Sequence, residues 1–341
     1  MTENPLGSAV PLVAAPMAGG ASGPRLALAA GRSGAFPFLA AGYQTVEALS
    51  DQIATLRTQN LPFGVNLFAP APVPIDETTF RAYAHQVQPD ADAHGLDVTT
   101  APLLEDDDGW HAKLDLLLTD PVPVVSVTFG LPHPREVAAL RRAGSQVLAT
   151  VTTVAEARAS ADAGVDALVV QGSDAGGHSG THDPARTLER VSAVDLTRAA
   201  VAATGLPVIA GGGVDGPAAV QRLLSAGARA VVVGTLLLRT PESGASPAHK
   251  DALADPAFTT TVVTRAFTGR PARSLRNAFT DRHSPRAPLG YPAVHHLTRP
   301  LRQAAARAGD AQRLHLWAGT GYRSARADPA ADVITALTRT L

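Results

Sequence analysis

A single histidine lies in a glycine-rich segment that follows a run of small apolar residues. The segment reads QGSDAGGHSG over residues 171–180, and the run VDALVV precedes it directly. A neutral imidazole has a pKa of about 6.5 and accepts a proton near neutral pH. The flanking glycines let the backbone curl tightly and leave room for a small ligand. These residue types predict either a general base at His178 or a histidine that makes only structural hydrogen bonds.

Two further glycine-rich turns, Gly211–Gly213 and Gly234–Thr235, follow later apolar runs. Glycine lets backbone N–H groups approach an anion closely, and the loops after strands 7 and 8 of a barrel frequently hold a phosphate. A sharp reversal of the chain explains either turn alone. Together, at consecutive strand ends, they predict a phosphate site. We assign the phosphate to a cofactor, because the chain otherwise lacks residues for redox or Lewis-acid chemistry.

The other histidines give weaker signals. His133 follows the segment FGLP at an expected strand end, so we predict that it contacts the substrate. His178 and His182 are four residues apart and Asp183 is adjacent, which resembles the spacing of metal ligands. Gly180 lies between them and no helix is expected there, so we expect no metal site. No G-x-S-x-G nucleophile elbow is present to support a Ser-His-Asp triad.

Composition limits the class of protein. The 341 residues carry a formal net charge of −1 and include no cysteine, which excludes disulfides, thiolate nucleophiles and iron–sulfur clusters. This charge gives no reason to expect nucleic acid or an anionic membrane as a partner. Residues 1–20 lack the pattern of a signal peptide, and no apolar run is long enough to span a membrane. We expect a cytoplasmic monomer or homodimer that acts on a small molecule.

Short apolar runs alternate with alanine-rich helical segments, most of which end in glycine. The runs are almost continuously apolar, as in parallel strands that are covered on both faces. Eight strand–helix units predict a (β/α)8 TIM barrel of the α/β class, with an open doubly wound sheet as the alternative. The eight runs cover residues 11–17, 35–41, 62–68, 122–130, 145–151, 166–172, 206–213 and 229–238.

Two segments interrupt this alternation. The interval 69–121, after the third strand, is too long for one crossover, so we predict an insertion that packs on the barrel. Its acidic run, 105–108, is expected to be a solvated loop. The segment 241–341 is mainly helical in pattern and is predicted to form a C-terminal subdomain that covers the barrel or a cofactor. The barrel with its insertion would then occupy residues 1–240.

Motifs at six of the expected strand ends resemble the nitronate monooxygenase family, formerly called 2-nitropropane dioxygenase. They occur in the family's order, from about residue 10 to WAGTGY at 317–322, and FTGRPARSLRN at 267–277 also resembles the family. Asp174, where glutamate is common, and the segment 181–188 depart from the pattern and bear on the substrate more than on the fold. The six motifs are APMAGG, GVNLF, TFGLP, QGSDAGGHSG, PVIAGGGV and VVGTLLLRTPESGASPAHKDAL.

The resemblance implies a TIM barrel that binds FMN, with His178 as the catalytic base. Four glycine-turn residues would cradle the FMN phosphate, and four others would contact the flavin ring system. The phosphate residues are Gly212, Gly213, Gly234 and Thr235. Of the ring residues, Met17 would flank the isoalloxazine, Asn66 and Gln171 would hydrogen-bond it, and Gly176 would line it.

The same resemblance implies a reaction. An alkyl nitronate, or a nitroalkane deprotonated by His178, would be oxidised with O₂ to a carbonyl compound and nitrite. Three alternatives stay open: an FMN- and NAD(P)H-dependent enoyl-ACP reductase, which shares the AGGHxG loop; a related flavin enzyme of secondary metabolism that acts on another nitro or activated substrate; and a catalytically silent flavin-binding module. APMAGG disfavours the first, and intact Asn66, Gln171 and His178 disfavour the last.

Overall fold

The structure, a computed structural model, describes residues 5–70, 73–339 and 341. The first four residues of the predicted barrel domain therefore lie outside it. So do residues 71–72 of the predicted insertion and residue 340 of the predicted C-terminal subdomain. Among the described residues, no helix combines the length and the apolar character needed to cross a membrane.

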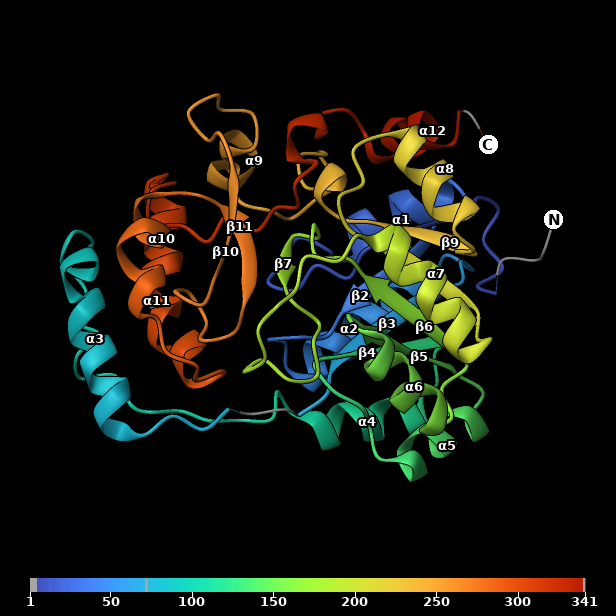
Figure 1. Cartoon of the computed structure of the whole chain (residues 1–341), viewed down its shortest axis with the longest axis horizontal. Coiled ribbons are helices and arrows are strands. Elements are labelled where there is room, and N and C mark those ends of the chain that lie inside the picture. Colours follow the sequence, from blue (N-terminus) through green and yellow to red (C-terminus); the bar gives the residue numbers. More distant parts are fainter. Residues whose placement is uncertain (1–4, 71–72, 340) are drawn as a thin grey trace.

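Eight parallel strands form a closed barrel, which confirms the predicted fold (Figure 1). β1 pairs with β9 as well as with β2, so the alternative of an open sheet is wrong. Each of the eight apolar runs contains one barrel strand. The strands, in barrel order, are β1 (Leu12–Ala14), β2 (Phe36–Ala40), β3 (Gly64–Phe68), β4 (Val124–Thr128), β5 (Gln146–Val151), β6 (Ala167–Gln171), β8 (Val208–Gly211) and β9 (Ala230–Val233).

Helices surround the barrel, and their ends follow local sequence rules. Thr45, Thr153 and Ser192 each accept a hydrogen bond from a backbone N–H three residues later and so cap a helix N-terminus. Gly205 ends a helix in the left-handed conformation, with φ 68°. The surrounding helices are α1 (Pro24–Arg32), α2 (Val46–Arg57), α4 (Trp110–Thr119), α5 (Pro134–Arg142), α6 (Val154–Asp162), α7 (Ala193–Thr204), α8 (Pro217–Ser225) and α12 (Ala330–Thr338).

The position of α12 differs from the predicted domain boundary at residue 240. This helix packs between α1 and α8, and its buried face joins the barrel core through Val333, Ile334 and Leu337. It therefore occupies the place of the eighth barrel helix, although about a hundred residues separate it from β9. The barrel consists of the N-terminal part of the chain together with this last helix.

The predicted insertion divides into two parts. α4 is the crossover helix between β3 and β4, and its Trp110 and Leu117 lie in the barrel core. The other helix, α3 (Glu77–Asp92), packs on the C-terminal extension and not on the barrel (Figure 1). Phe80 of α3 shares a hydrophobic cluster with Phe267 and Phe279. The expectation that the insertion packs on the barrel is therefore wrong for α3, because its apolar face matches that of the extension.

The C-terminal extension also contains strands that were not predicted. An antiparallel hairpin of β10 (Thr261–Thr264) and β11 (Ala272–Leu275) pairs with β7 (Gly177–His178), which lies outside the barrel. The extension therefore contributes a small sheet as well as helices to one end of the barrel (Figure 1). Its helical elements are α9 (Pro247–Ala252), α10 (Ala278–His283) and α11 (Ala293–Ala308), with the 3-10 turns η2 (Ser284–Arg286) and η3 (Tyr322–Ser324). A further 3-10 turn, η1 (Thr235–Leu237), directly follows β9.

Candidate active site

A cavity of about 720 Å³ lies at the carboxyl ends of the barrel strands and is bordered by the C-terminal extension. Its volume is in the range of small-molecule and cofactor sites. It brings together every predicted catalytic and cofactor-binding residue, and leaves out the predicted substrate residue His133. The residues brought together are Met17, Asn66, Gln171, Gly176, His178, Gly212, Gly213, Gly234 and Thr235.

The turns after β8 and β9 present unpaired backbone donors. In the part of the chain that the structure describes, the N–H groups of Gly212, Gly213, Gly234 and Thr235 donate to no other protein group. Gly212 and Gly213 have φ values of 125° and 73°, which favour glycine. A Cβ at Gly213 would lie 3.0 Å from the Cβ of Asp174. Space and backbone conformation together keep these donors uncovered, as an anion site requires.

Residues of the C-terminal extension complete this turn region. The N–H of Gly319 donates to Oγ1 of Thr235 over 2.9 Å, and the N–H of Thr320 donates to the carbonyl of Asp174 over 3.0 Å. A Cβ at Gly176 would lie 2.5 Å from the backbone nitrogen of Gly319. The sequence indicated the motif WAGTGY but gave these residues no role. Their contribution depends on contacts between segments that are about 85 to 145 residues apart in the sequence.

The His178 loop is fixed by hydrogen bonds on both sides. β7 pairs with β11, and the N–H of Ser179 donates to the carbonyl of Pro271 over 2.8 Å. Nε2 of Gln171 donates to the carbonyl of His178 over 3.0 Å, and its Oε1 accepts from the N–H of Gly180 over 2.7 Å. Gln171 therefore holds the loop in place. One hydrogen and one lone pair of its amide remain for a ligand.

His178 is a weaker base in the structure than the sequence analysis assumed. Burial, together with the positive charges of Arg270 and Arg302, lowers the pKa of His178 to about 3. The imidazole is therefore neutral at physiological pH. Its Nε2 lies 2.9 Å from Oγ1 of Thr268, and its Nδ1 has no partner among the described residues. Nδ1 is thus the ring nitrogen that is available to a ligand.

Asn66 belongs to a polar network that crosses three barrel strands. Its Nδ2 donates to Oγ of Ser126 over 2.9 Å and to Oγ1 of Thr128 over 3.0 Å. Oγ1 of Thr128 in turn lies 3.0 Å from Oγ1 of Thr150. Asn66 is only 3% exposed, and its Oδ1 accepts from no described protein group. The network orients the amide and leaves Oδ1 as an acceptor at the bottom of the cavity.

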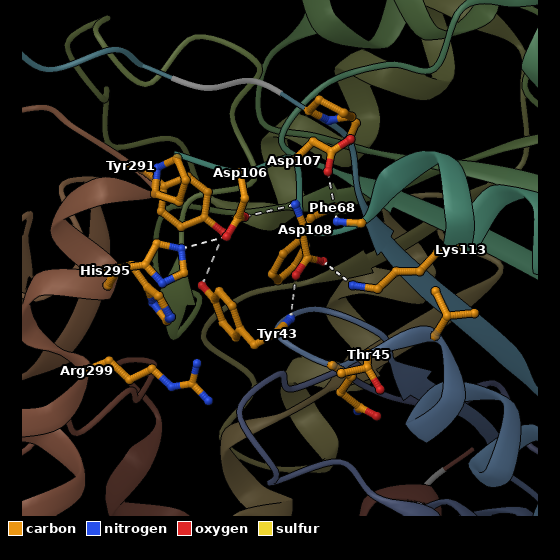
Figure 2. A pocket seen from close by; sticks show the side chains of 17 residues that line it. Tyr43, Thr45, Phe68, Asp106, Asp107, Asp108, Lys113, Tyr291, His295 and Arg299 are labelled. Atoms are coloured by element: carbon orange, nitrogen blue, oxygen red, sulfur yellow. Dashed lines mark hydrogen bonds and ion pairs between the residues drawn. The ribbon is translucent and has the colours of Figure 1, made fainter. Parts of the chain in front are cut away.

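A wall of aromatic side chains lines both the main cavity and a second cavity of about 460 Å³, which Figure 2 shows from close by. Tyr43 and His295 stack face to face, with ring centroids 4.1 Å apart and planes 9° apart. Together with Phe68 and Arg299 they line both cavities. Sequence patterns did not indicate Tyr43 or His295 as cavity residues, since neither lies in a glycine-rich loop. The only available signal was the position of Tyr43 just after the second apolar run.

A buried ion pair supports this wall (Figure 2). Tyr43 has a φ of 67°, and its N–H donates to Oδ1 of Asp108 over 2.8 Å. Nζ of Lys113 donates to Oδ2 of Asp108 over 2.7 Å and to the carbonyl of Ala41 over 3.0 Å. Burial raises the pKa of Asp108, and Lys113 opposes that rise. The prediction of a solvated acidic loop thus holds for the exposed residues 105–107 and is wrong for Asp108.

Two other histidines that the sequence singled out, His133 and His182, lie outside the cavity. His133 is exposed and caps α5: its Nδ1 accepts from the N–H of Arg135, and its own N–H donates to Glu136 over 2.7 Å. This capping role explains its type and position without any substrate. Nε2 of His182 lies 3.0 Å from the carbonyl oxygen of Thr150. No group of three or more metal-ligating side chains occurs within the described residues.

The chain as a whole is similar to proteins of one known family. The family profile described as "Nitronate monooxygenase" matches residues 5–340. A Staphylococcus aureus (strain Newman) protein named "Probable nitronate monooxygenase" is 33% identical over 330 residues, which cover 95% of this chain and 92% of the relative.

Solved structures agree with this relationship. Nitroalkane oxidase from Streptomyces ansochromogenes is 46% identical with a TM-score of 0.91, and the match covers 97% of this chain and 95% of that one. FabK from Thermotoga maritima has a TM-score of 0.71 at 23% identity, covering 98% and 93% of the two chains, and this likeness shows the fold alone. The family profile spans the barrel, the insertion and the extension that together enclose the cavity, so this chain belongs to the nitronate monooxygenase family, a family of oxidoreductases.

Proposed function

We propose that this protein binds FMN and oxidises alkyl nitronates, and less readily nitroalkanes, with O₂ to a carbonyl compound and nitrite. One observation carries the proposal: His178 and four unpaired backbone N–H groups at the ends of β8 and β9 line the same cavity. A nitronate requires a base or hydrogen-bonding group such as His178. A phosphorylated cofactor requires an anion site such as these N–H groups form. Family membership supplies the class of substrate.

The cavity suits a flavin mononucleotide. Gly212, Gly213, Gly234 and Thr235 would hold its single terminal phosphate, because within the described chain their N–H groups donate to no protein group. Nδ1 of His315, another lining group, is buried without a hydrogen-bond partner in the described chain, as expected where a ligand supplies one. When bound, FMN would supply electron transfer from the substrate and reaction with O₂.

Other residues would hold the ring system of the flavin. Oδ1 of Asn66 and the remaining donor of Gln171 are available for hydrogen bonds, while Met17 and Gly176 offer apolar and backbone surface. The network behind Asn66 fixes its amide before any ligand arrives. The chain's own contribution is therefore orientation, with little rearrangement on binding.

His178 would act at the carbon next to the nitro group. Its free Nδ1 would accept the proton from a neutral nitroalkane, and Thr268 would hold the ring from the Nε2 side. With its pKa at about 3, the imidazole is a poor base in the free protein. A pre-formed nitronate needs no such proton transfer. The lowered pKa of His178 is therefore in line with nitronates being better substrates than nitroalkanes.

The test is made on the purified protein. Flavin is released by heat and identified by chromatography, and nitrite is measured after mixing with propionate 3-nitronate in air. FMN together with nitrite formation supports the proposal. Recovery of FAD, no flavin after reconstitution, or oxidation of NAD(P)H with an enoyl thioester and none of the nitronate would overturn it.

A further inference from the structure

Helix α11 places a charged side chain in the main cavity without an acidic partner. Arg302 is only 5% exposed and lines the cavity. Its Nε donates to Oγ1 of Thr298 over 3.0 Å, and its Nη2 donates to the carbonyl of His295 over 2.9 Å. Nη1 has no partner among the residues that the structure describes. The guanidinium is therefore anchored at one side and free at the other.

The surroundings of Arg302 contain no counter-charge. Its ionisable neighbours include Tyr43, Tyr291, Arg299 and His295, of which none is an acid that is charged at neutral pH. None of the described residues that line the cavity is aspartate or glutamate. Burial lowers the pKa of Arg302 to about 10, so it remains charged at neutral pH. An unpaired buried cation costs free energy, and such charges normally have a partner. An anion bound in the cavity would supply this missing partner.

The position of Arg302 indicates which anion this is. Nη2 of Arg302 lies 3.2 Å from Nδ1 of His295, and the ring centroid of Tyr291 lies 6.3 Å from that of His295 and 6.0 Å from that of His178. Arg302 therefore borders the same part of the cavity as His178, and its positive charge contributes to the lowered pKa of that histidine. Arg270, the other cation that acts on His178, is fully buried, donates to the carbonyls of Thr181 and Ser179, and does not line the cavity. Arg302 is thus the buried guanidinium that a bound substrate can reach.

We propose that Arg302 binds the deprotonated nitro group of the substrate and makes the enzyme select nitronate anions over neutral nitroalkanes. A planar guanidinium matches the two oxygens of a nitronate as it matches a carboxylate. The hydrogen bonds to Thr298 and His295 hold the side chain of Arg302 in place before the substrate arrives. His295 is itself held by stacking on Tyr43 (Figure 2). This inference rests on the proposed function.

The test compares Arg302→Gln and Arg302→Lys with the unmodified protein at equal flavin content. Loss of a charge-assisted contact should raise KM for ethyl nitronate roughly 10- to 100-fold in Arg302→Gln, with a smaller rise in Arg302→Lys. KM for neutral nitroethane should change much less. Arg307→Gln is the matched control, because it removes the same charge from an exposed position of the same helix and should leave all constants unchanged.

A binding measurement makes the test independent of turnover. Nitrate, a planar oxyanion, should bind to the unmodified protein in calorimetry and compete with ethyl nitronate, and Arg302→Gln should lose that binding. Absence of nitrate binding and competition in the unmodified protein would overturn the inference even if the variants fail to fold.

Comparing two nitronate substrates shows whether Arg302 binds the nitronate group or a carboxylate of the substrate. Propionate 3-nitronate carries a carboxylate and ethyl nitronate does not. If Arg302→Gln impairs only the former, the arginine binds the carboxylate and the inference is wrong. If the unmodified protein oxidises neither nitronate, the proposed function fails. If it oxidises both and Arg302→Gln behaves like the parent, the inference fails alone.

Discussion

At the scale of single residues, the site combines groups whose properties come from their surroundings. Burial and nearby guanidinium groups make His178 a neutral, weakly basic imidazole. Gly212 and Gly213 have no side chain that could cover their backbone N–H groups. A Cβ at either position would lie about 3.0 Å from other protein atoms, so a larger residue would not fit there. The chemistry thus depends on the folded environment as much as on residue type. Two substitutions test this.

The first is His178→Asn. If His178 removes the proton of a nitroalkane, turnover of nitroethane should fall by about 10² to 10⁴-fold, the usual value of general-base catalysis. Oxidation of pre-formed ethyl nitronate should fall much less. Initial rates of nitrite formation on both substrates, at equal flavin content, make the measurement. An equal loss on both would show that His178 positions the substrate and does not take its proton.

The second substitution is Gly213→Asp. The new carboxylate would face the phosphate and crowd Asp174, and an aspartate is strained at a φ of 73°. We expect the purified variant to lose its flavin absorbance. Gly205→Asp is the control, since it has a φ of 68° and open space at a helix end away from the cavity. Equal flavin retention in Gly213→Asp and the parent would contradict the phosphate assignment.

At the scale of elements, the barrel strands and many helix ends were predictable because their sequence patterns are local. Each barrel strand was visible as an apolar run, and helix ends such as Gly205 carried their usual signals. β7 was not predictable, because two residues in a glycine loop carry no strand pattern and pair with β11, almost a hundred residues away. The predicted site residues in strand-end loops line one cavity, whereas the positions of Tyr43, His295 and Arg302 in its lining depend on distant segments that meet only in the fold.

The Asp108–Lys113 pair shows how one element supports another. Lys113→Met would leave the carboxylate of Asp108 part-buried and unpaired, and we expect a loss of about 3 kcal/mol in the free energy of unfolding. The double variant Asp108→Asn/Lys113→Met should lose less, because an amide can still accept from the N–H of Tyr43. Urea denaturation followed by circular dichroism measures both. If the double variant is no more stable than Lys113→Met, Lys113 does not stabilise the protein by compensating the charge of Asp108.

At the scale of the whole molecule, Asp90 joins the insertion to the extension. This 3%-exposed carboxylate of α3 accepts hydrogen bonds from Arg282, His283 and Arg313. Burial alone would raise the pKa of Asp90, but the hydrogen bonds from His283 and Arg282 outweigh it and hold the pKa at about 2. The stabilisation is therefore complete above about pH 4 and is lost as the pH falls toward 2.

Asp90→Asn tests this linkage. The variant should unfold at a lower temperature than the parent at pH 7, and the difference should shrink as the pH is lowered from 4 to 2.5. Thermal unfolding followed by circular dichroism at several pH values gives the comparison. Asp51→Asn, at an exposed position of α2, is the control and should match the parent throughout. A difference that stays constant with pH would show that the charge of Asp90 is not responsible.

The place of α12 has a consequence for how the chain is made. All eight barrel strands are complete at Val233, yet the helix that fills the gap between α1 and α8 begins only at Ala330. During synthesis at about 5–20 residues per second, the nascent barrel therefore exposes an apolar strip for several seconds while the intervening extension emerges. That interval is when the nascent chain is most open to chaperone binding or to association with a neighbouring copy.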